Sequence, residues 1–314
     1  MRGRFAPSPS GRLHLGNAYT ALLSWLQVRA AGGQFLLRIE DLDSARCRGE
    51  YLDSLRRDLE YLGLYWDEEP IFQSRRQQAY REAFAALERQ GLTYPCFCSR
   101  SEISRAASAP HGPADDGPRY PGTCAALSRD QVRERALERM PATRFRAVPG
   151  STDFVDEVQG RRLEDVRSQV GDFVIRKNDS VASYQFAVVI DDAYSRISHV
   201  LRGADLVSST ARQIQLYRAL RLSPPRFAHV GLVVSVEGAR LAKREGAFSV
   251  SQLRSLGIEA RRIVGLLGKW AGIHDGTPIS AVELVSSFAL ERLPREPVRT
   301  NEEQVRAHLD LAPM

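Results

Sequence analysis

The sequence predicts an α/β fold in which a Rossmann-type parallel sheet is interrupted by an inserted module and followed by a short helical part. Strand-like and helix-like segments alternate over residues 4–89, which is typical of a parallel sheet with crossover helices. The alternation stops near Tyr94, where three of the four cysteines and a loop rich in Pro, Gly, Ala and Asp follow. It resumes near Tyr184, and segments after about residue 249 look helical.

Residues 1–94 are expected to form the first half of the sheet. A run of turn-forming residues, 7–11, ends the first strand, and apolar residues at helical spacing follow Gly16. The predicted elements are a strand at 4–6, a helix ending at 32–33, a buried strand at 35–39, and helices over about 50–62 and 74–89.

Residues 95–178 are expected to form the inserted module, and residues 179–235 the second half of the sheet. Ser128 and Gln131 have the spacing of a capping box, which predicts a helix to about Arg139. Short strands are expected at 143–147, 154–158 and 172–176 in the insert, and then a strand at 184–190, a strand at 197–201, a helix at 208–220 and a strand at 228–234.

Residues 236–314 are expected to form a loop and a C-terminal helical domain. The predicted helices cover 251–256, 260–270 and 281–290.

Composition limits the class of protein. The 314 residues are 43% hydrophobic and 26% charged, which excludes a disordered, collagen-like or coiled-coil chain. No apolar run approaches the ~18 residues of a membrane span, and the N-terminus has no apolar signal region. We therefore expect a cytoplasmic protein without a membrane contact, and nothing in the sequence implies an obligate protein partner.

Basic residues slightly outnumber acidic ones. Lys and Arg total 44 against 38 Asp and Glu, so the net charge is +6, which suits a polyanionic partner such as nucleic acid. Only Lys177, Lys243 and Lys269 are lysine. A lysine at a particular position is therefore informative in this chain.

The first motif with chemical content is the segment 10–17, Ser-Gly-Arg-Leu-His-Leu-Gly-Asn, between a predicted strand and a predicted helix. A helix N-terminus offers unpaired N–H groups and a positive dipole end to a phosphate. Gly16 would let the backbone approach a ligand, and His14 could donate to a phosphate oxygen. A turn with a packed histidine is the alternative, and it is the better reading of an isolated His-x-Gly.

The second motif is the segment 234–247, in which Arg240, Lys243 and Arg244 lie in a Gly-flanked loop after a strand. A loop of this kind could bring Lys243 onto a phosphate whose negative charge grows in a transition state. A solvated basic loop is the alternative. The use of lysine in an arginine-dominated chain favours a specific role.

Three cysteines cluster at Cys96, Cys98 and Cys124, which indicates a metal site. Zinc takes about four N, S or O ligands in a tetrahedron, so a fourth ligand is needed. His111 and Tyr120 are the nearby candidates, and chemistry alone favours His111 because imidazole is the commoner ligand. Buried thiols without a metal are the other alternative.

Together the two motifs resemble the HIGH and KMSKS motifs of class I aminoacyl-tRNA synthetases. The opening Arg-Phe-Ala-Pro-Ser-Pro-Ser-Gly-Arg-Leu-His-Leu-Gly, 4–16, and Arg-Ile-Glu-Asp-Leu-Asp, 38–43, are similar to the glutamyl-tRNA synthetase family. The resemblance covers about the first 95 residues and then 170–250. Asn17 replaces the last histidine of HIGH, and Arg240 and Ala242 depart from KMSKS.

The resemblance implies a Rossmann catalytic domain, a two-step reaction that begins with ATP and L-glutamate, and Mg²⁺ on the phosphates. It also favours Tyr120 as the fourth zinc ligand, with one zinc per chain. The implied residues are His14, Gly16, Asn17 and Lys243 for catalysis; His14, Gly16, Lys243 and Arg244 for ATP; Arg4, Ser8, Glu40, Tyr184 and Arg202 for glutamate; and Cys96, Cys98, Tyr120 and Cys124 for zinc.

Length and the cysteine cluster point to the acceptor. Only about 65 residues follow Gly246, whereas a full glutamyl-tRNA synthetase has a long C-terminal region that reads the anticodon. The chain is in this respect similar to the glutamyl-Q tRNA(Asp) synthetases, which join glutamate to queuosine in the anticodon loop of tRNA(Asp). The alternatives are a short glutamyl-tRNA synthetase that charges tRNA(Glu), a small-molecule adenylate-forming ligase, and a non-catalytic RNA-binding module.

Overall fold

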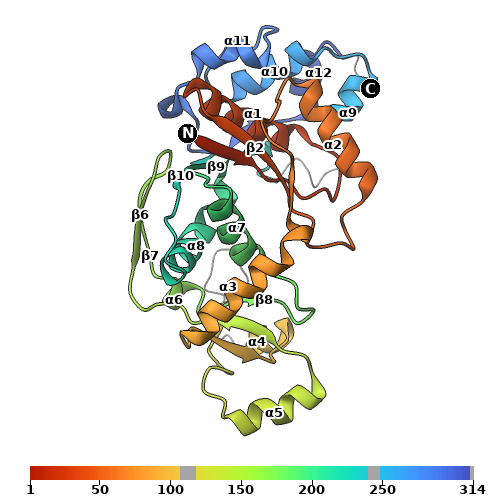
Figure 1. Ribbon diagram of the computed structural model, residues 1–314. Coiled ribbons are helices and arrows are strands. Elements are labelled where there is room, and N and C mark those ends of the chain that lie inside the picture. Colours follow the sequence, from red (N-terminus) through yellow and green to blue (C-terminus); the bar gives the residue numbers. More distant parts are fainter. Residues whose placement is uncertain (107–117, 240–247, 312–314) are drawn as a thin grey trace.

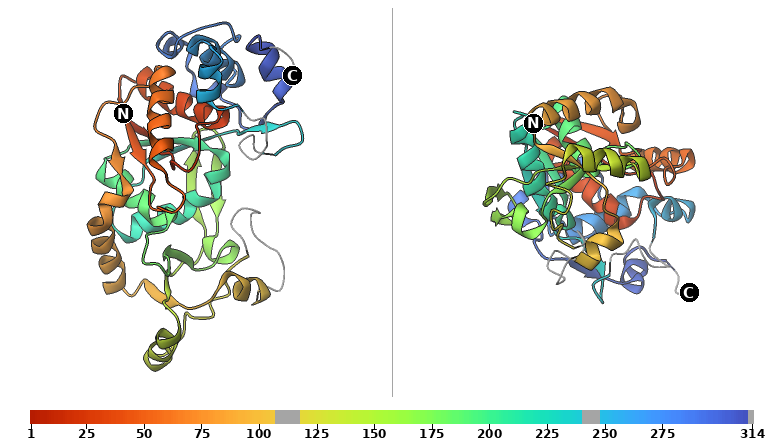
Figure 2. Two further views of the ribbon diagram at one scale, coloured as in Figure 1. Left: turned by 90° about the vertical axis from the view of Figure 1, so that its right-hand side faces the viewer. Right: turned by 90° about the horizontal axis from the view of Figure 1, so that it is seen from below.

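The computed structural model describes residues 1–106, 118–239 and 248–311. The molecule is elongated, as both side views show (Figures 1 and 2). The C-terminal helices lie at one end with α1 and α2, and α5 lies at the opposite end. No helix among the described residues is both long enough and apolar enough to span a bilayer.

Two groups of parallel strands form the central sheet. The first group is β1 (Arg2–Phe5), β2 (Gln34–Ile39) and β3 (Ile71–Phe72), in the order β1-β2-β3. The second is β9 (His199–Gly203), β10 (Arg226–Val230) and β6 (Thr152–Asp156), with β7 (Gly160–Glu164) antiparallel at its edge. The Ser198 N–H donates to the Arg2 carbonyl at 2.9 Å, so β1 lies between β2 and the start of β9.

The three helices predicted for this part of the chain are present, whereas strand β3 was not predicted from the sequence. Helix α1 (Leu15–Ala30) follows β1, α2 (Gly49–Tyr61) follows β2, and α3 (Gln77–Arg89) follows β3 and the 3-10 turn η1 (Gln73–Arg76). Helix α1 is buried along most of its length because it packs on β1, β2 and β9 and under the C-terminal helices. By contrast α2 and α3 each bury one face.

A separate antiparallel sheet follows, with β4 (Thr93–Cys96), β5 (Ala142–Phe145) and β8 (Phe173–Arg176) in that order. The helices α4 (Arg100–Ala106), α5 (Arg129–Glu138) and α6 (Val166–Gln169) accompany it. Helix α5 begins with the predicted capping box of Ser128 and Gln131. The range 95–178 also contains β6 and β7, which belong to the central sheet.

One predicted strand is wrong. The segment 184–190 is the start of helix α7 (Tyr184–Tyr194), not a strand. Its run of apolar and β-branched residues resembles a buried strand, but α7 is covered by α3, α8 and β8, so a helix there also needs apolar residues on most sides. Phe186 on α7 stacks on Phe84 of α3 with ring centroids 4.2 Å apart.

The predicted strand at 228–234 is two strands, β10 and β11 (Val233–Ser235). They are separated at Gly231, where the chain passes so close to residues 294–296 that a Cβ would lie 1.9 Å from the Glu296 carbonyl oxygen. Strand β11 pairs in parallel with β12 (Val298–Thr300), which the sequence analysis did not predict.

After β9, the helices predicted at 208–220, 251–256 and 260–270 are all present. The remaining elements are η2 (Ala204–Leu206), α8 (Val207–Ala219), α9 (Val250–Ser255), α10 (Ala260–Trp270), α11 (Ala281–Leu284), η4 (Val285–Ser287), η5 (Leu290–Arg292) and α12 (Glu302–His308). The predicted helix 281–290 is therefore one short α-helix continued by 3-10 turns.

Candidate functional site

A pocket of about 510 Å³ opens where β1, β2 and β9 end. The strand order reverses at β1, and ligands of open α/β sheets bind at such a switch point beyond the carboxyl ends of the strands. The eight predicted binding or catalytic residues that the structure describes, outside the cysteine cluster, all line this pocket: Arg4, Ser8, His14, Gly16, Asn17, Glu40, Tyr184 and Arg202.

The His14 segment forms one wall of the pocket at the N-terminus of α1. His14 is the N-cap residue of that helix and has an extended backbone. A Cβ built on Gly16 would meet only the Val233 carbonyl oxygen, at 3.9 Å. Packing within the protein therefore does not require glycine here, and the space beside Gly16 belongs to the pocket.

The second motif lies outside the described residues over 240–247, including Lys243 and Arg244. The chain on both sides of it is described. Val233 lines the pocket before it, and after it the Phe248 carbonyl accepts a hydrogen bond from the Leu15 N–H at 3.2 Å. Val250 continues the contact by donating to the Leu13 carbonyl at 2.8 Å.

Arg4, at the end of β1, is held by a buried ion pair. Its Nε donates to Oδ1 of Asp192 at 3.1 Å, and both side chains are at least 95% buried. Arg38 on β2 also binds Asp192 and donates to Glu40 at 3.1 Å. The four side chains form one network at the base of the pocket, in which two guanidinium groups share two carboxylates.

Burial and charge oppose one another in this network. Burial raises the pKa of Glu40, and the neighbouring Arg38 and Arg4 partly offset that rise. Burial would also raise the pKa of Asp192, but Arg38 and Arg4 hold it below its ordinary value. Asp192 is therefore the fixed anion of the pair, and Glu40 is the carboxylate that lines the pocket.

Arg202, at the end of β9, is the second buried arginine of the pocket. Its Nη1 donates to the Tyr184 hydroxyl at 3.2 Å, and its Nη2 donates to Thr210 at 3.0 Å and to the Leu206 carbonyl at 3.3 Å. Its Nε donates to Nε2 of His229 at 2.8 Å. These four bonds fix the plane of the guanidinium group and leave one Nη1 N–H without a protein acceptor among the described residues.

Sequence reasoning missed four residues that support the pocket arginines: Arg38, Asp192, His229 and Asp156. Their signal was a charged or polar residue within an apolar run, as in the Asp pair near the end of the apolar helix α7. Such a residue must be paired when it is buried, and its partner is then a buried group of opposite charge. The partner itself was not visible from one sequence.

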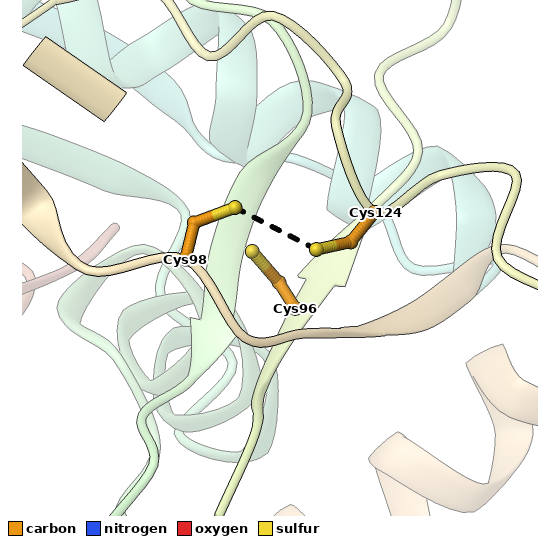
Figure 3. A group of neighbouring side chains, drawn as sticks. All are labelled: Cys96, Cys98 and Cys124. Atoms are coloured by element: carbon orange, nitrogen blue, oxygen red, sulfur yellow. Dashed lines mark hydrogen bonds between the residues drawn. The ribbon is translucent and has the colours of Figure 1, made fainter. Parts of the chain in front are cut away.

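The cysteine cluster lies in the antiparallel module, away from this pocket. The sulfur atoms of Cys96, Cys98 and Cys124 point toward one another (Figure 3) and lie within 4.8 Å of one another. Cys98 Sγ and Cys124 Sγ are 3.6 Å apart. The Tyr120 hydroxyl lies 3.4 Å from Cys96 Sγ and 3.9 Å from Cys98 Sγ.

This geometry fits a tetrahedral zinc site. Thiolate ligands at ~2.3 Å from zinc lie about 3.8 Å apart, which is close to the observed spacing. Arg144 contributes positive charge beside the cluster, because its Nε donates to Cys96 Sγ at 3.2 Å and its guanidinium lies 3.6 Å from the centre of the Tyr120 ring. The other candidate ligand, His111, lies outside the described residues.

The arrangement can bind a small molecule that carries both signs of charge. Two buried arginines can hold anionic groups, and the half-buried Glu40 can accept from a cation. Ser8 and Tyr184 add hydroxyl groups. A phosphate group would meet the Gly16 N–H at the positive end of α1, since the N–H groups of Leu15 and Asn17 donate to the carbonyl groups of Phe248 and His14.

Comparison with known proteins agrees with this geometry. Residues 1–306 match the family described as class I tRNA synthetases (E and Q), catalytic domain. The chain is 46% identical to the glutamyl-Q tRNA(Asp) synthetase of Symbiobacterium thermophilum over 97% of each chain. It is 47% identical to the protein of that name from Deinococcus radiodurans, over 87% of this chain and 91% of the other.

Glutamate–tRNA ligases are also similar but longer. Glutamate–tRNA ligase 2 of Nitrosococcus oceani is 40% identical, over 97% of this chain and 66% of the ligase. The crystal structure of a glutamate tRNA ligase from Elizabethkingia meningosepticum, in complex with its amino acid, superposes with a TM-score of 0.82 at 25% identity, over 98% of this chain and 68% of that chain. The chain therefore belongs to the class I tRNA synthetase family for glutamate and glutamine, and within it to the glutamyl-Q tRNA(Asp) synthetases.

Proposed function

We propose that this protein activates glutamate with ATP and transfers it to the queuosine base in the anticodon loop of tRNA(Asp). The main observation behind the proposed activation of glutamate is the pocket itself. It combines Arg4, Arg202 and Glu40 with the N-terminus of α1 at the switch point of the sheet. The relatives named above support the same chemistry.

Glutamate needs three contacts, and the pocket offers three kinds of group. Arg4 and Arg202 bind its two carboxylates, and Glu40 accepts from its ammonium group. Ser8 and Tyr184 complete the contacts with hydroxyl groups. The buried ion pair with Asp192 holds Arg4 in place before substrate arrives, and the four hydrogen bonds of Arg202 hold that side chain. This reduces the entropy lost on binding.

Activation is an in-line displacement at the α-phosphate of ATP. A carboxylate oxygen of glutamate forms a bond to the α-phosphorus, and the bond from that phosphorus to the bridging oxygen breaks, so pyrophosphate leaves. The carboxylate is already ionised near pH 7, so the protein needs no general base. Its residues position the reactants and stabilise charge, with His14, Gly16, Asn17, Lys243 and Arg244 in these roles. Mg²⁺ neutralises phosphate charge when it is bound with ATP.

The pattern of relatives favours queuosine in tRNA(Asp) as the acceptor. Those matched along 97% and 91% of their own length are named glutamyl-Q tRNA(Asp) synthetase. The matched glutamate–tRNA ligase is covered over only 66%. A hydroxyl group of the queuosine diol would attack the adenylate carbonyl carbon, and AMP would leave.

We further propose one structural zinc per chain, bound by Cys96, Cys98, Tyr120 and Cys124. The sulfur spacing and the adjacent Arg144 support it. The proposed organisation follows the chain. Residues 1–94 and 179–235 form most of the catalytic sheet, and 95–178 form the zinc module and also add β6 and β7 to that sheet. Residues 236–314 form the KMSKS-like loop and a helical domain that contacts the RNA.

Radiolabelled glutamate tests the acceptor directly. The protein is incubated with ATP and either queuosine-containing or queuosine-free tRNA(Asp), and tRNA(Glu) is offered separately. We expect label only on the queuosine-containing RNA, retained on the modified nucleoside after nuclease digestion. Label on the terminal adenosine of tRNA(Glu) would instead identify a short glutamyl-tRNA synthetase. Absence of glutamate-dependent pyrophosphate exchange would leave a non-catalytic RNA-binding module.

A further inference from the structure

A second row of buried polar residues lies behind Arg202. His229 on β10 is the register partner of Arg202 on β9, so the two side chains lie side by side on one face of the sheet. Asp156 ends the next strand, β6, and accepts a hydrogen bond from Nδ1 of His229. All three side chains are at least 95% buried. Three neighbouring strands thus contribute a continuous chain of carboxylate, imidazole and guanidinium.

The hydrogen bonds fix the protonation state of His229. Its Nε2 faces the Nε–H of Arg202, which can only donate, so Nε2 must be an unprotonated acceptor. Its Nδ1 must then carry the proton that is donated to Asp156. Burial lowers the pKa of His229 to about 4, although the bond to Asp156 opposes this, so the ring is neutral at pH 7.

Asp156 is itself held in one orientation. Its Oδ1 accepts three backbone N–H groups, from Val158 at 3.1 Å, Gln159 at 2.8 Å and His229 at 3.1 Å. Its Oδ2 faces the His229 ring. The turn between β6 and β7 therefore determines which oxygen meets the imidazole.

We propose that His229 and Asp156 are positioning residues for substrate binding, which act by holding the imidazole in the Nδ1–H tautomer so that Arg202 keeps its guanidinium plane in the pocket. This inference deepens the proposed function and rests on it. Asp156 sets the tautomer, His229 accepts from Nε of Arg202, and the remaining Nη1 N–H of Arg202 is directed to a carboxylate of the amino acid.

The substitution Asp156→Asn tests whether the position of Arg202 depends on the His229 tautomer. Asparagine is nearly isosteric with aspartate, so the change alters hydrogen bonding with little change of shape. The three backbone N–H groups keep the amide oxygen at the Oδ1 position, so the amide nitrogen must face His229. An N–H donor there requires an acceptor at Nδ1 and moves the ring proton to Nε2. Two donors, Nε2–H and the Arg202 Nε–H, then face one another, and Arg202 must move.

Nitrogen-15 NMR of the imidazole rings gives a readout that does not depend on activity. The chain has six histidines, and the His229 signals are assigned as those lost in His229→Gln. We expect the Nδ1–H tautomer at pH 7 in the wild type and the Nε2–H tautomer in Asp156→Asn. A charged ring or an Nε2–H tautomer in the wild-type protein would overturn the proposal without any variant.

Steady-state kinetics of glutamate-dependent pyrophosphate exchange give the second readout. Loss of a hydrogen bond to a charged group costs ~1.5–3 kcal/mol, so Asp156→Asn should raise the KM for glutamate roughly 10- to 150-fold. The KM for ATP should change less than about twofold, because ATP binds at the α1 end of the pocket. Equal KM values for glutamate in wild type and variant would overturn the proposal.

Two further variants separate positioning from folding. His229→Gln can keep an acceptor toward Arg202, whereas His229→Asn can keep only the donor toward Asp156, so the glutamate KM should rise more in His229→Asn. Asp153→Asn makes the same chemical change on the same strand, at an exposed ion pair with Arg161, and should alter neither tautomer nor KM. A wild-type protein inactive with glutamate would refute the proposed function alone, since the tautomer is measured independently.

Discussion

Gly16 shows at the scale of one residue how the pocket is kept open. It lies in the first turn of α1 and lines the pocket, and an added Cβ would meet only the Val233 carbonyl oxygen, at an ordinary contact distance of 3.9 Å. We expect Gly16→Ala to keep or slightly raise the melting temperature, because alanine favours helix by ~1 kcal/mol over glycine. Pyrophosphate exchange should fall about tenfold or more, because the methyl group occupies space that the nucleotide approaches.

Gly49→Ala is the matched control for Gly16→Ala. Gly49 begins α2 and, like Gly16, has room for an added Cβ, with no atom within 4 Å of it, but it does not line the pocket. Thermal unfolding and exchange rates are measured for both variants. An exchange rate for Gly16→Ala equal to that for Gly49→Ala would remove Gly16 from the ATP site.

Lys243 is the residue on which phosphate stabilisation is predicted to depend most. It is one of three lysines in the chain and stands at the KMSKS position. Loss of one electrostatic stabiliser of a transition state costs ~10²–10³ in rate, so Lys243→Ala should lower kcat for exchange by that factor while the KM for glutamate changes little. Lys177→Ala, at an exposed ion pair with Asp179, is the control. A change in kcat below about threefold contradicts the assigned role.

The depressed pKa of His229 also predicts how stability depends on pH. The folded ring has a pKa of about 4 against an ordinary value of 6.5, so between these values the unfolded chain binds a proton that the folded chain does not. The contribution of neutral His229 is thus complete above pH 6.5 and falls as pH drops toward 4. The difference in unfolding free energy between wild type and His229→Gln should shrink over that window, as urea titrations at several pH values would measure; a constant difference contradicts a buried neutral ring.

At the scale of elements, helices and strands are predicted best from sequence where the spacing of apolar residues matches the face that the element buries. Helices α2 and α3 bury one face each, so their apolar spacing is visible in the sequence, and α5 begins at its capping box. Helix α7 is the opposite case, because burial on most sides removes the helical spacing and leaves an apolar run that resembles a strand. Strand β12 has three residues and pairs across some 60 residues of chain, so no local pattern marks it.

Bound zinc should stabilise the antiparallel module formed by β4, β5 and β8. Its small apolar cluster is separate from the two that surround the sheet, so its stability depends on few contacts. We expect Cys98→Ser to lose zinc and to lower the melting temperature by roughly 5 °C or more, since bound zinc contributes folding free energy. Exchange activity should stay within about twofold, because the pocket is built on other elements.

Cys47→Ser is the control for Cys98→Ser, since Cys47 lies outside the cluster. Elemental analysis of protein purified without a metal-chelate column gives the zinc content. His111→Ala should retain about one zinc per chain. Loss of zinc from His111→Ala would replace Tyr120 by His111 as the fourth ligand, and less than about a tenth of an equivalent in fresh wild-type protein would reject the zinc site.

At the scale of the whole molecule, the predicted site residues come together because they follow different strands of one sheet. Arg4, Glu40 and Arg202 are far apart in sequence, and only the parallel strand order brings them to one edge. Motif resemblance could select them because each lies in a recognisable segment. The supporting chain of Asp156 and His229 could not be selected in this way, since its geometry depends on the register of β6, β9 and β10.

The two substrates should respond differently to salt because they meet different parts of the molecule. Glutamate is proposed to meet arginines that are at least 95% buried, where added salt screens little. The RNA must meet exposed arginines of a chain with net charge +6. With three phosphate contacts alone, raising the salt from ~50 to ~200 mM would weaken RNA binding roughly 40-fold.

We therefore expect the KM for tRNA(Asp) to rise by at least about tenfold over this range in aminoacylation assays, while the KM for glutamate in pyrophosphate exchange changes less than about twofold. Sucrose at matched osmolality is the control, and parallel changes in both KM values would place the glutamate arginines in contact with solvent.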